Sequence, residues 1–201
     1  MLTQAVPLAL SFKGNRNYIT GADIAQAMLN LTGSCSQLRI EFHHMAACAL
    51  SMQEVSADQL PAMKQLDDVY AWLACTDSSG SQRFWLARGQ ETSTHLVRLE
   101  YDESVFTRHA MIDDTGIHAD AASMLTSPID ALVALNKHML NQCVEVHPWI
   151  FVRLDMQHWP LDLQHVFLKR PAKALHGLYK TQIVCNGTAS GAIYFTRRPT
   201  P

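Results

Sequence analysis

The segment from Ile112 to Asp120 places carboxylates on both sides of a histidine, in a stretch rich in turn-forming residues. Asp113 precedes His118 by five positions, so a turn can bring the carboxylate to the imidazole ring. Such a carboxylate orients the ring and tunes its affinity for a proton, and the pair can transfer protons near neutral pH. The segment therefore predicts Asp113 and His118 as a catalytic pair. The alternative is a structural turn, in which Asp-Asp-Thr-Gly side chains cap backbone N–H groups.

The remaining histidines and the cysteines predict no metal site and no cofactor. His138, Cys143 and His147 lie near one another in the sequence, but a helix end separates them and no fourth ligand follows at a recognisable spacing. The chain has 5 cysteines, none of them in a Cys-x-x-Cys pair. An odd number without such pairs is typical of reduced thiols rather than of a disulfide framework. Cys48 and Cys75 lie inside apolar runs and are predicted to be core residues.

Length and charge exclude several classes of function. With 201 residues, 48% of them apolar, the chain can bury the core of one large domain or of two small fused domains. Its 16 basic and 18 acidic residues give a net charge of −2, which favours neither a nucleic acid nor an anionic membrane as partner. The N-terminal residues lack the pattern of a secretory signal, and no apolar run reaches the roughly 20 residues of a membrane span. We therefore expect a cytoplasmic protein.

The same order of elements occurs twice, with corresponding parts about 107 residues apart. Each copy has a short apolar run, a helix, a strand-like run and a hairpin turn, and such a recurrence indicates an internal duplication. The apolar runs are Val6–Phe12 and Val105–Ile112, the helices begin near Gly21 and Ser127, the strand-like runs are Leu38–Met52 and Trp149–Met156, and the turns are Asp77–Gly80 and Asn186–Gly191. We expect two halves, residues 1–102 and 103–201, packed as one body. The alternative is one mixed sheet whose hairpins share this spacing by chance.

The two predicted helices differ in the number of faces that they bury. In the first, about Ala22–Leu31, apolar residues recur on one face, so this helix should lie against a sheet. In the second, Ser127 suits the N-cap, Pro128 the first helical position and Asp130 the positive end of the helix dipole. Its apolar residues cover more than one stripe, which predicts deep burial. Strands are predicted at 70–75, 83–87, 95–99 and 180–196, and a surface excursion at 51–68.

The acid/base segment resembles the signature of the (R)-specific enoyl-CoA hydratases of the hot-dog fold. That pattern is Asp-x-Asn-Pro-(Ile/Leu)-His-x-Asp, and Asp113, Ile117, His118 and Asp120 match it. Thr115 stands where the family has Asn and Gly116 where it has Pro. Ser127-Pro128-Ile129 then falls where that family begins its central helix.

The first half resembles the hot-dog dehydratases of fatty-acid synthesis. Their signature is His-Phe-Pro-Gly, then Pro-Gly, then a helix containing Glu-Ala-Met or Asp-Ala-Met. Ser11-Phe12-Lys13-Gly14, Gly21 and Gln26-Ala27-Met28 follow the same order, with one extra residue between the two glycines. Ser11 replaces the catalytic histidine of that family and Gln26 replaces its catalytic carboxylate. This half therefore resembles the family in its scaffold and lacks its acid/base pair.

Both resemblances imply an α+β double hot-dog, in which two central helices are each wrapped by a curved antiparallel sheet. They imply an acyl thioester, acyl-CoA or acyl carrier protein, bound between the halves, and reversible hydration of an enoyl thioester as the reaction. Asp113 and His118 would activate the water, and a backbone N–H at a helix start would polarise the thioester carbonyl. Substrate contacts are expected at Gly21, Gln26, Thr115, Gly116 and Arg170.

Two basic groups suit the phosphates of coenzyme A, because arginine binds phosphate oxygens through two parallel hydrogen bonds. They are Lys169-Arg170 with Lys173, and Arg197-Arg198 near the C-terminus. The alternative is that these side chains are solvated strand ends without a ligand.

The sequence is compatible with three other functions, and it leaves the oligomeric state open. A catalytically silent hot-dog module for binding or assembly is favoured by Ser11, Gln26, Thr115 and Gly116. A hot-dog thioesterase would use a carboxylate near a helix start, with Asp23 and Asp130 as candidates. A mixed α/β interaction protein outside this fold is the third alternative. A homodimer is compatible with each of these functions.

Overall fold

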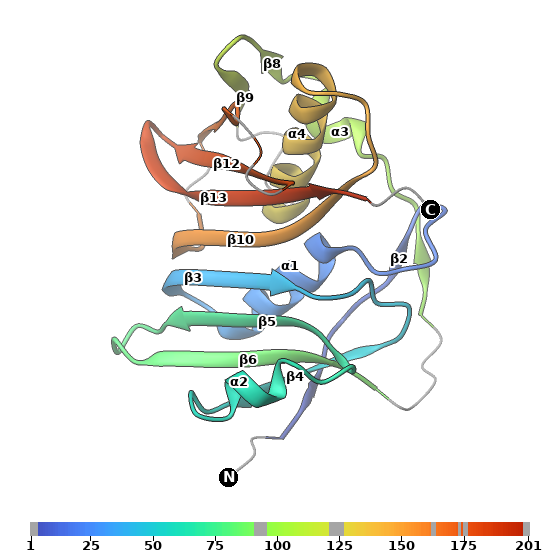
Figure 1. The fold of residues 1–201 in the computed structure, drawn as a ribbon, viewed down its shortest axis with the longest axis vertical. Coiled ribbons are helices and arrows are strands. Elements are labelled where there is room, and N and C mark those ends of the chain that lie inside the picture. Colours follow the sequence, from blue (N-terminus) through green and yellow to red (C-terminus); the bar gives the residue numbers. More distant parts are fainter. Residues whose placement is uncertain are drawn as a thin grey trace. The chain divides into compact units, whose positions relative to one another are not determined.

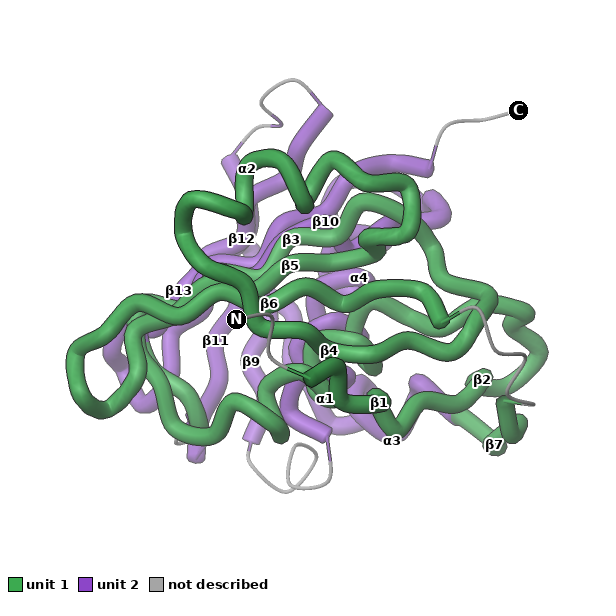
Figure 2. Tube along the Cα trace, turned by 90° about the horizontal axis from the view of Figure 1, so that it is seen from below, with its two compact units in different colours: residues 1–101, 158–160 green, residues 102–157, 161–201 purple. Residues whose placement is uncertain are grey.

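The computed structural model describes residues 4–90, 96–120, 127–161, 164–172, 174 and 177–198. The chain divides into two compact units (Figure 2). Unit 1 comprises residues 1–101 and 158–160, and unit 2 comprises residues 102–157 and 161–201. Each unit combines helices with an antiparallel sheet, as the predicted α+β class requires (Figure 1). Within the described ranges, no helix has the length and apolarity needed to cross a membrane.

Helix α1 (Gly21–Thr32) buries one face, as its apolar spacing predicts. Ala22, Ile24, Ala25, Met28 and Leu29 are the buried residues. Thr20 is the N-cap, and its hydroxyl accepts a hydrogen bond from the backbone N–H of Asp23 at 3.2 Å. Asp23 lies in the first turn, where a negative charge is favourable, and it forms an ion pair with Lys13 at 2.5 Å. The start of α1 is therefore fixed by a cap and by an ion pair.

The sheet of unit 1 has five strands, all paired antiparallel. Their order is β1 (Val6–Pro7), β4 (Leu50–Val55), β6 (Gln82–Gly89), β5 (Val69–Thr76) and β3 (Cys35–Phe42). A separate parallel pair joins β2 (Phe12–Lys13) to β7 (Arg98–Leu99). On one face of the larger sheet, a cluster of buried side chains packs against the short helix α2 (Leu60–Met63): Val55, Val69, Trp72 and Leu86.

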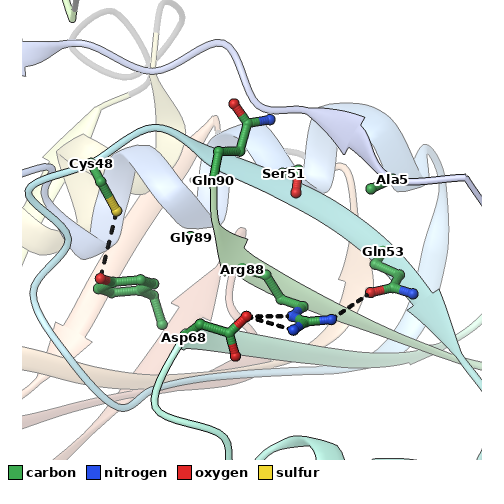
Figure 3. A pocket seen from close by; sticks show the side chains of 9 residues that line it. Ala5, Cys48, Ser51, Gln53, Asp68, Arg88, Gly89 and Gln90 are labelled. Atoms are coloured by element: carbon green, nitrogen blue, oxygen red, sulfur yellow. Dashed lines mark hydrogen bonds and ion pairs between the residues drawn. The ribbon is translucent and has the colours of Figure 1, made fainter. Parts of the chain in front are cut away.

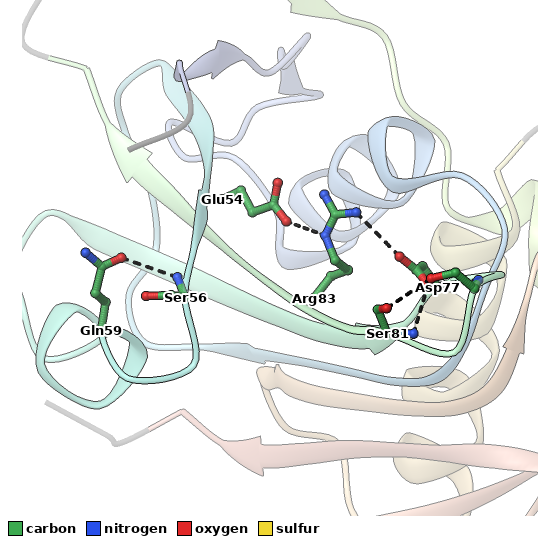
Figure 4. A network of polar contacts seen from close by, with 7 residues as sticks. Glu54, Ser56, Gln59, Asp77, Ser81 and Arg83 are labelled. Atoms are coloured by element: carbon green, nitrogen blue, oxygen red, sulfur yellow. Dashed lines mark hydrogen bonds and ion pairs between the residues drawn. The ribbon is translucent and has the colours of Figure 1, made fainter. Parts of the chain in front are cut away.

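Asp77 shapes the turn between β5 and β6. Its Oδ1 accepts hydrogen bonds from the backbone N–H groups of Ser79 at 2.9 Å and Ser81 at 3.0 Å, and from the Ser79 hydroxyl. Its Oδ2 faces Arg83, which also pairs with Glu54 on β4 (Figure 4). Aspartate favours such turns because its carboxylate replaces the missing backbone partners. The predicted turn at Asp77–Gly80 is confirmed.

The sheet of unit 2 has six strands, again all antiparallel. Their order is β10 (Trp149–Trp159), β13 (Thr188–Arg197), β12 (Leu178–Cys185), β11 (His165–Lys169), β9 (Gly116–Asp120) and β8 (Met111–Ile112). Helix α4 (Pro128–Cys143) lies along one face of this sheet and contacts β9 and β13 (Figure 1). The short helix α3 (Ser104–Thr107) contacts α4 as well.

Helix α4 is buried over most of its circumference, as predicted. Ten of its residues are buried, and they include the polar residues Asp130 and Asn136. Ser127 occupies the N-cap position and Pro128 the first helical position, as predicted. The Ser127 side chain makes no capping bond to the backbone, however, and its hydroxyl instead donates to Asp130 Oδ2 at 2.6 Å. The start of α4 therefore holds a buried carboxylate bound to a serine.

The two units repeat the element order, but they do not repeat the strand pairing. After the helix, unit 1 pairs β3 with the first arm of its hairpin, β5, whereas unit 2 pairs β10 with the second arm, β13. The turn of the first hairpin therefore lies beside the start of β3, and the turn of the second beside the end of β10. Ser36↔Thr76 and Met156↔Gly191 are the pairs that show this. Sequence order fixes which strands form a hairpin, but not which arm pairs with a third strand.

Several predicted elements have different bounds in the structure. The run Val6–Phe12 is divided between β1 and β2, and the run Val105–Ile112 is not one strand but α3 followed by β8. The turn predicted at Asn186–Gly191 is shorter, because β13 begins at Thr188. The strand expected at 95–99 is shorter in the structure, where β7 comprises Arg98–Leu99. Residue 95, the first of the expected strand, lies outside the described residues. The excursion at 51–68 begins only after β4 ends at Val55.

Gly116 permits the close approach of β9 to β11. A Cβ atom at this position would lie 2.1 Å from the Leu168 carbonyl oxygen and 2.7 Å from Phe167 Cε2. We expect Gly116→Ala to lower the free energy of unfolding by about 3 kcal/mol, since the backbone of β11 would have to move. Gly80→Ala is the control, because Gly80 has open space and a φ of 84°, so only its backbone conformation opposes the change. Its expected cost is about 1 kcal/mol. Urea denaturation of both variants measures the difference, and equal losses would contradict the steric explanation.

Thr181 on β12 buries a hydroxyl completely, and this hydroxyl has no hydrogen-bond partner among the described residues. Valine has nearly the same shape and no polar atom to desolvate. Thr181→Val should therefore raise the free energy of unfolding by about 1 kcal/mol. The matched control is Thr196→Val on β13, because the Thr196 hydroxyl already donates to the Gly177 carbonyl at 3.2 Å and its loss should bring no gain. Thermal unfolding compares the two, and a Thr181→Val protein of lower stability would refute the prediction.

Candidate functional site

The hairpin formed by β8 and β9 contains the predicted acid/base segment. Asp113 lies in its turn, and Asp113 Oδ1 accepts hydrogen bonds from Thr115 N at 2.7 Å, from Thr115 Oγ1 at 2.6 Å and from Gly116 N at 3.1 Å. The backbone N–H of Asp113 donates to the Gly116 carbonyl at 3.0 Å. One carboxylate oxygen of Asp113 thus closes the turn, as the alternative of a structural turn predicts. The other oxygen faces a different group.

Asp113 Oδ2 faces the imidazole of His118, and His118 Nε2 lies 3.2 Å from it. The imidazole also stacks on Phe167 of β11, with ring centroids 4.4 Å apart and an interplanar angle of 20°. This position follows from strand alternation, because Ile117 and Ala119 are buried and His118 points to the other face of β9. The His118 and Asp113 side chains are 41% and 55% exposed. The structure therefore brings the two predicted residues together at a surface open to water.

The turn contacts hold the pKa of Asp113 at about 2, well below its ordinary value. The largest cause is the hydrogen bond from the Thr115 hydroxyl, followed by the one from the Thr115 backbone, and the charge of His118 contributes less. The carboxylate is therefore ionised near neutral pH and is a weak base there. If the pair transfers protons, His118 is the group that carries them and Asp113 orients it.

Thr115, Gly116 and Arg170 lie around this pair, and the contacts described below hold the fold together. The Thr115 hydroxyl and the Gly116 N–H both donate to Asp113, as described above. The backbone N–H of Arg170 donates to the Thr115 carbonyl at 2.7 Å, and its Nη2 donates to the Cys143 carbonyl at the end of α4 at 2.9 Å. Arg170 therefore ties the hairpin to the C-terminal end of α4 and remains exposed.

Gly21 and Gln26, the other two predicted substrate contacts, belong to unit 1. Gly21 is the first residue of α1. Gln26 Nε2 donates to Asn30 Oδ1 at 2.9 Å, whereas its buried Oε1 has no partner among the described residues. Asp23, a candidate for the thioesterase alternative, is engaged by Lys13 and by the Thr20 hydroxyl at 2.6 Å.

Asp130 is the other thioesterase candidate, and it is the more enclosed carboxylate. It lies in the first turn of α4 with 5% of its surface exposed, and the Ser127 hydroxyl donates to it. Buried carboxylates are costly unless hydrogen bonds compensate them, so they are frequent at functional sites. Its position at the positive end of a helix dipole also stabilises its charge.

Some of the basic side chains proposed to bind phosphate form contacts within the protein. Arg197 Nε forms an ion pair with Glu145 at 2.9 Å, and its Nη2 donates to the Tyr179 hydroxyl at 2.9 Å. Lys169 is exposed at the end of β11, and Lys173 lies outside the described residues. These contacts are compatible with the interpretation of this region as solvated strand ends.

A second carboxylate–imidazole contact joins β9 to β11, and no sequence motif indicates it. His165 Nδ1 on β11 lies 2.7 Å from Asp120 Oδ1, because the two residues are direct cross-strand partners. Both side chains are highly exposed, with 76% of the His165 side chain and 81% of the Asp120 side chain accessible to water. The contact depends on the register between β9 and β11, and the distance between Asp120 and His165 in the sequence does not reveal this register. In the described part of the chain, no three His, Cys, Asp or Glu side chains are grouped so as to hold a metal ion.

Unit 1 contains a polar pocket of about 420 Å³ that no sequence motif indicates (Figure 3). Arg88 donates to Asp68 Oδ2 from Nε at 2.9 Å and from Nη2 at 2.5 Å, and its Nη1 donates to Gln53 at 3.2 Å. Beside this network the Cys48 thiol donates to the Tyr70 hydroxyl at 3.5 Å. The residues come from β4, β5, β6 and the loops next to them, so only strand pairing could have identified the group. Opposite charges face each other within the pocket and leave it without a net charge.

Solved structures resemble this chain over most of its length. A monomeric dehydratase domain from a trans-AT polyketide synthase split module is 11% identical over 97% of each chain, with a TM-score of 0.45. The dehydratase domain of PpsC from Mycobacterium tuberculosis, in complex with C12:1-CoA, is 12% identical over 90% of this chain and 85% of that chain, with a TM-score of 0.47. A protein assigned as an oleoyl thioesterase from Lactobacillus plantarum is 10% identical over 98% of this chain and 96% of that chain, with a TM-score of 0.44.

No family model matches the chain, and no curated protein matches it in sequence. The three TM-scores lie between 0.44 and 0.47 at identities of 10–12%. The fold and the site of this protein therefore rest on its own strand order and contacts.

The pKa of Asp113 provides a direct test of the turn. A carboxyl ¹³C titration should place the Asp113 midpoint near 2. Because this pKa is lowered in the folded state, the stabilisation by the carboxylate is present above the ordinary carboxyl pKa and is lost as the pH falls through about 2. Thr115→Val should raise the Asp113 midpoint toward its ordinary value, since it removes the largest cause of the shift. Asp77, whose pKa the Ser79 hydroxyl lowers, serves as the internal control and should not change. An unaltered Asp113 midpoint would show that the hydroxyl is not the cause.

Proposed function

We propose that this protein binds acyl thioesters as a fused double hot-dog and catalyses the reversible hydration of enoyl thioesters. The observation that carries the proposal is the contact between Asp113 Oδ2 and His118 Nε2 at 3.2 Å. In support, each unit has one helix of at least three turns against an antiparallel sheet, which is what the resemblance to hot-dog enzymes implies. The substrate would be an acyl-CoA or an acyl carrier protein thioester.

In the proposed mechanism, His118 is the acid/base group and Asp113 its positioning residue. Asp113 holds the Nε2 proton, so Nδ1 is the nitrogen with a lone pair. Nδ1 accepts a proton from water while the water oxygen forms a bond to C3 of the enoyl thioester. The electron pair of the double bond moves toward the thioester carbonyl, and the imidazolium then gives its proton to C2. Dehydration follows the same steps in reverse.

The contacts around Asp113 suit it to a positioning role. Three hydrogen bonds fix Oδ1, so Oδ2 has a defined direction toward the imidazole. The ring itself is held by its stack on Phe167. Arg170, exposed beside the hairpin, supplies the positive charge proposed for a phosphate of coenzyme A.

A thioesterase is the second candidate, and a separate observation favours it. Asp130 is almost fully buried at the start of α4 and is bound to the Ser127 hydroxyl. A carboxylate at this point could activate water for attack at the thioester carbonyl, with hydrolysis in place of hydration. The two candidates use different carboxylates, so substitutions separate them.

The deciding experiment follows the loss of absorbance of the conjugated thioester when crotonyl-CoA or a medium-chain enoyl-CoA is hydrated. His118→Ala should lower kcat by about a hundredfold or more, because general acid/base catalysis contributes at least that much. Asp113→Asn should lower kcat as well, with a smaller effect on KM. Asp120→Asn is the matched control, since Asp120 forms the other carboxylate–imidazole contact of β9 and has no proposed role. Circular dichroism establishes that the variants are folded.

The outcomes assign the function. Hydration that is lost with His118 and kept in Asp120→Asn supports the hydratase. Release of free coenzyme A that is lost in Asp130→Asn, without hydration, would replace the hydratase by the thioesterase. A wild-type protein that performs neither reaction but binds acyl-CoA in calorimetry would be the silent binding module, and His118 would then have no catalytic role.

A further inference from the structure

Two cysteines lie on neighbouring strands of unit 1. Cys35 is the first residue of β3, and Cys75 is the last but one of β5. The strands are antiparallel and pair Ser36 with Thr76, so each cysteine immediately precedes one member of this pair. Because side chains alternate along a strand, both cysteines point away from the face of Ser36 and Thr76. They are therefore diagonal neighbours on one face of the sheet.

The buried positions of β5 identify this face. Trp72 and Ala74 pack with the cluster on α2, so Leu73 and Cys75 point to the opposite face. A bulge between Ser36 and Arg39, with Gln37 at a φ of 48°, shifts the register of β3 beside Cys75. Cys35 and Cys75 are only 8% and 3% exposed, and both are free thiols.

The two thiols differ in their ionisation. The hydrogen bond from Cys75 lowers the pKa of Cys35 and outweighs the opposing effect of burial. The same bond, burial and the charge of Asp77 raise the pKa of Cys75 far above its ordinary value. Cys35 is thus the thiol that ionises first, and Cys75 is the partner that keeps its proton. A thiolate beside a second thiol is the arrangement in which oxidation at one sulfur is resolved by the other.

Cys35 is also the cysteine of this pair that lines a pocket. The pocket has a volume of about 260 Å³ and lies within unit 1, between the segments 34–36 and 76–78 and residues His158 and Trp159. Its lining residues include Ser34, Ser36, Thr76 and Ser78. Cys35 borders this pocket and Cys75 does not, so Cys35 is the cysteine of the pair nearer to a small polar oxidant in the pocket.

We propose that Cys35 and Cys75 form a dithiol that responds to hydrogen peroxide, with Cys35 as the sulfur attacked first and Cys75 as the resolving thiol. The Cys35 thiolate attacks one peroxide oxygen, the O–O bond breaks, and Cys35 becomes a sulfenic acid while hydroxide leaves. The Cys75 sulfur then attacks Cys35, the S–O bond breaks, and an S–S bond forms. The proton of Cys75 leaves with the hydroxyl group as water. The two thiols are oxidised, and one peroxide is reduced to two waters.

Tryptic peptides report this bond without ambiguity. Cleavage places Cys35 in residues 17–39 and Cys75 in residues 65–83, and each of these peptides contains no other cysteine. The full-length protein is treated with graded peroxide, blocked with N-ethylmaleimide and digested without reductant. We expect a linked pair of these two peptides that is two hydrogens lighter than their sum and that disappears with dithiothreitol. Oxidation that appears first at Cys48, Cys143 or Cys185 would overturn the assignment.

A substitution separates the two roles. In Cys75→Ser the sulfenic acid of Cys35 cannot be resolved, so labelling of residues 17–39 by dimedone should rise by roughly tenfold over wild type. Cys48→Ser is the matched control and should keep both the linked peptides and the low dimedone labelling. Equal labelling of Cys35 in wild type and Cys75→Ser would refute the resolving role. If Cys75→Ser does not fold, the wild-type peptide map alone decides, and the absence of the linked pair would refute the proposal.

Discussion

The burial of α4 is the constraint on which unit 2 depends. A helix that buries ten of its sixteen residues needs cover on more than one side, and β9, β13 and α3 supply it. The buried polar residues increase this demand, because Asn136 is fully buried and its amide has no partner among the described residues. Strand β9 must therefore present Ile117 and Ala119 to the helix, which leaves His118 on the outer face. The position of the candidate site is thus a consequence of helix packing.

One side chain in this site performs two tasks. Asp113 uses Oδ1 to close a turn and Oδ2 to face an imidazole, so the geometry of the pair is set by the hairpin and not by long-range packing. Asp77 closes the turn of the first hairpin with the same kind of contacts, but its second oxygen faces Arg83 in place of a histidine (Figure 4). The residue that contacts the second carboxylate oxygen therefore distinguishes the two turns. The contact with Arg83 only stabilises the hairpin, whereas the contact with His118 can also orient an imidazole that transfers protons.

The sequence was sufficient for elements whose signal is local. The apolar spacing of α1, the Ser127-Pro128 start of α4 and the turn at Asp77 are each determined by neighbouring residues, and all three are present. The contact between Asp113 and His118 could also be predicted, because only four residues separate them in the sequence. The pair of Asp120 and His165, the pocket around Arg88 and the meeting of Cys35 with Cys75 depend on strand register across 40 or more residues, or on three strands at once. Composition and periodicity carry no information about such register.

The first hairpin pairs with β3 through its first arm and the second hairpin pairs with β10 through its second arm. This difference affects how the two halves can be compared. If the chain arose by duplication, equivalence by sequence order matches β5 with β12, whereas equivalence by position in the sheet matches β5 with β13. The two criteria agree for the helix, for the strand that follows it (β3 with β10) and for the next strand (β4 with β11), and they differ for the two arms of the hairpin. Ancestral residues inferred by aligning the halves in sequence order would therefore be assigned to different positions in the sheet for the two hairpin arms. Evolutionary reconstruction of this protein therefore has a reliable internal reference in the helix and the two strands that follow it, and it needs an independent criterion for the hairpin arms.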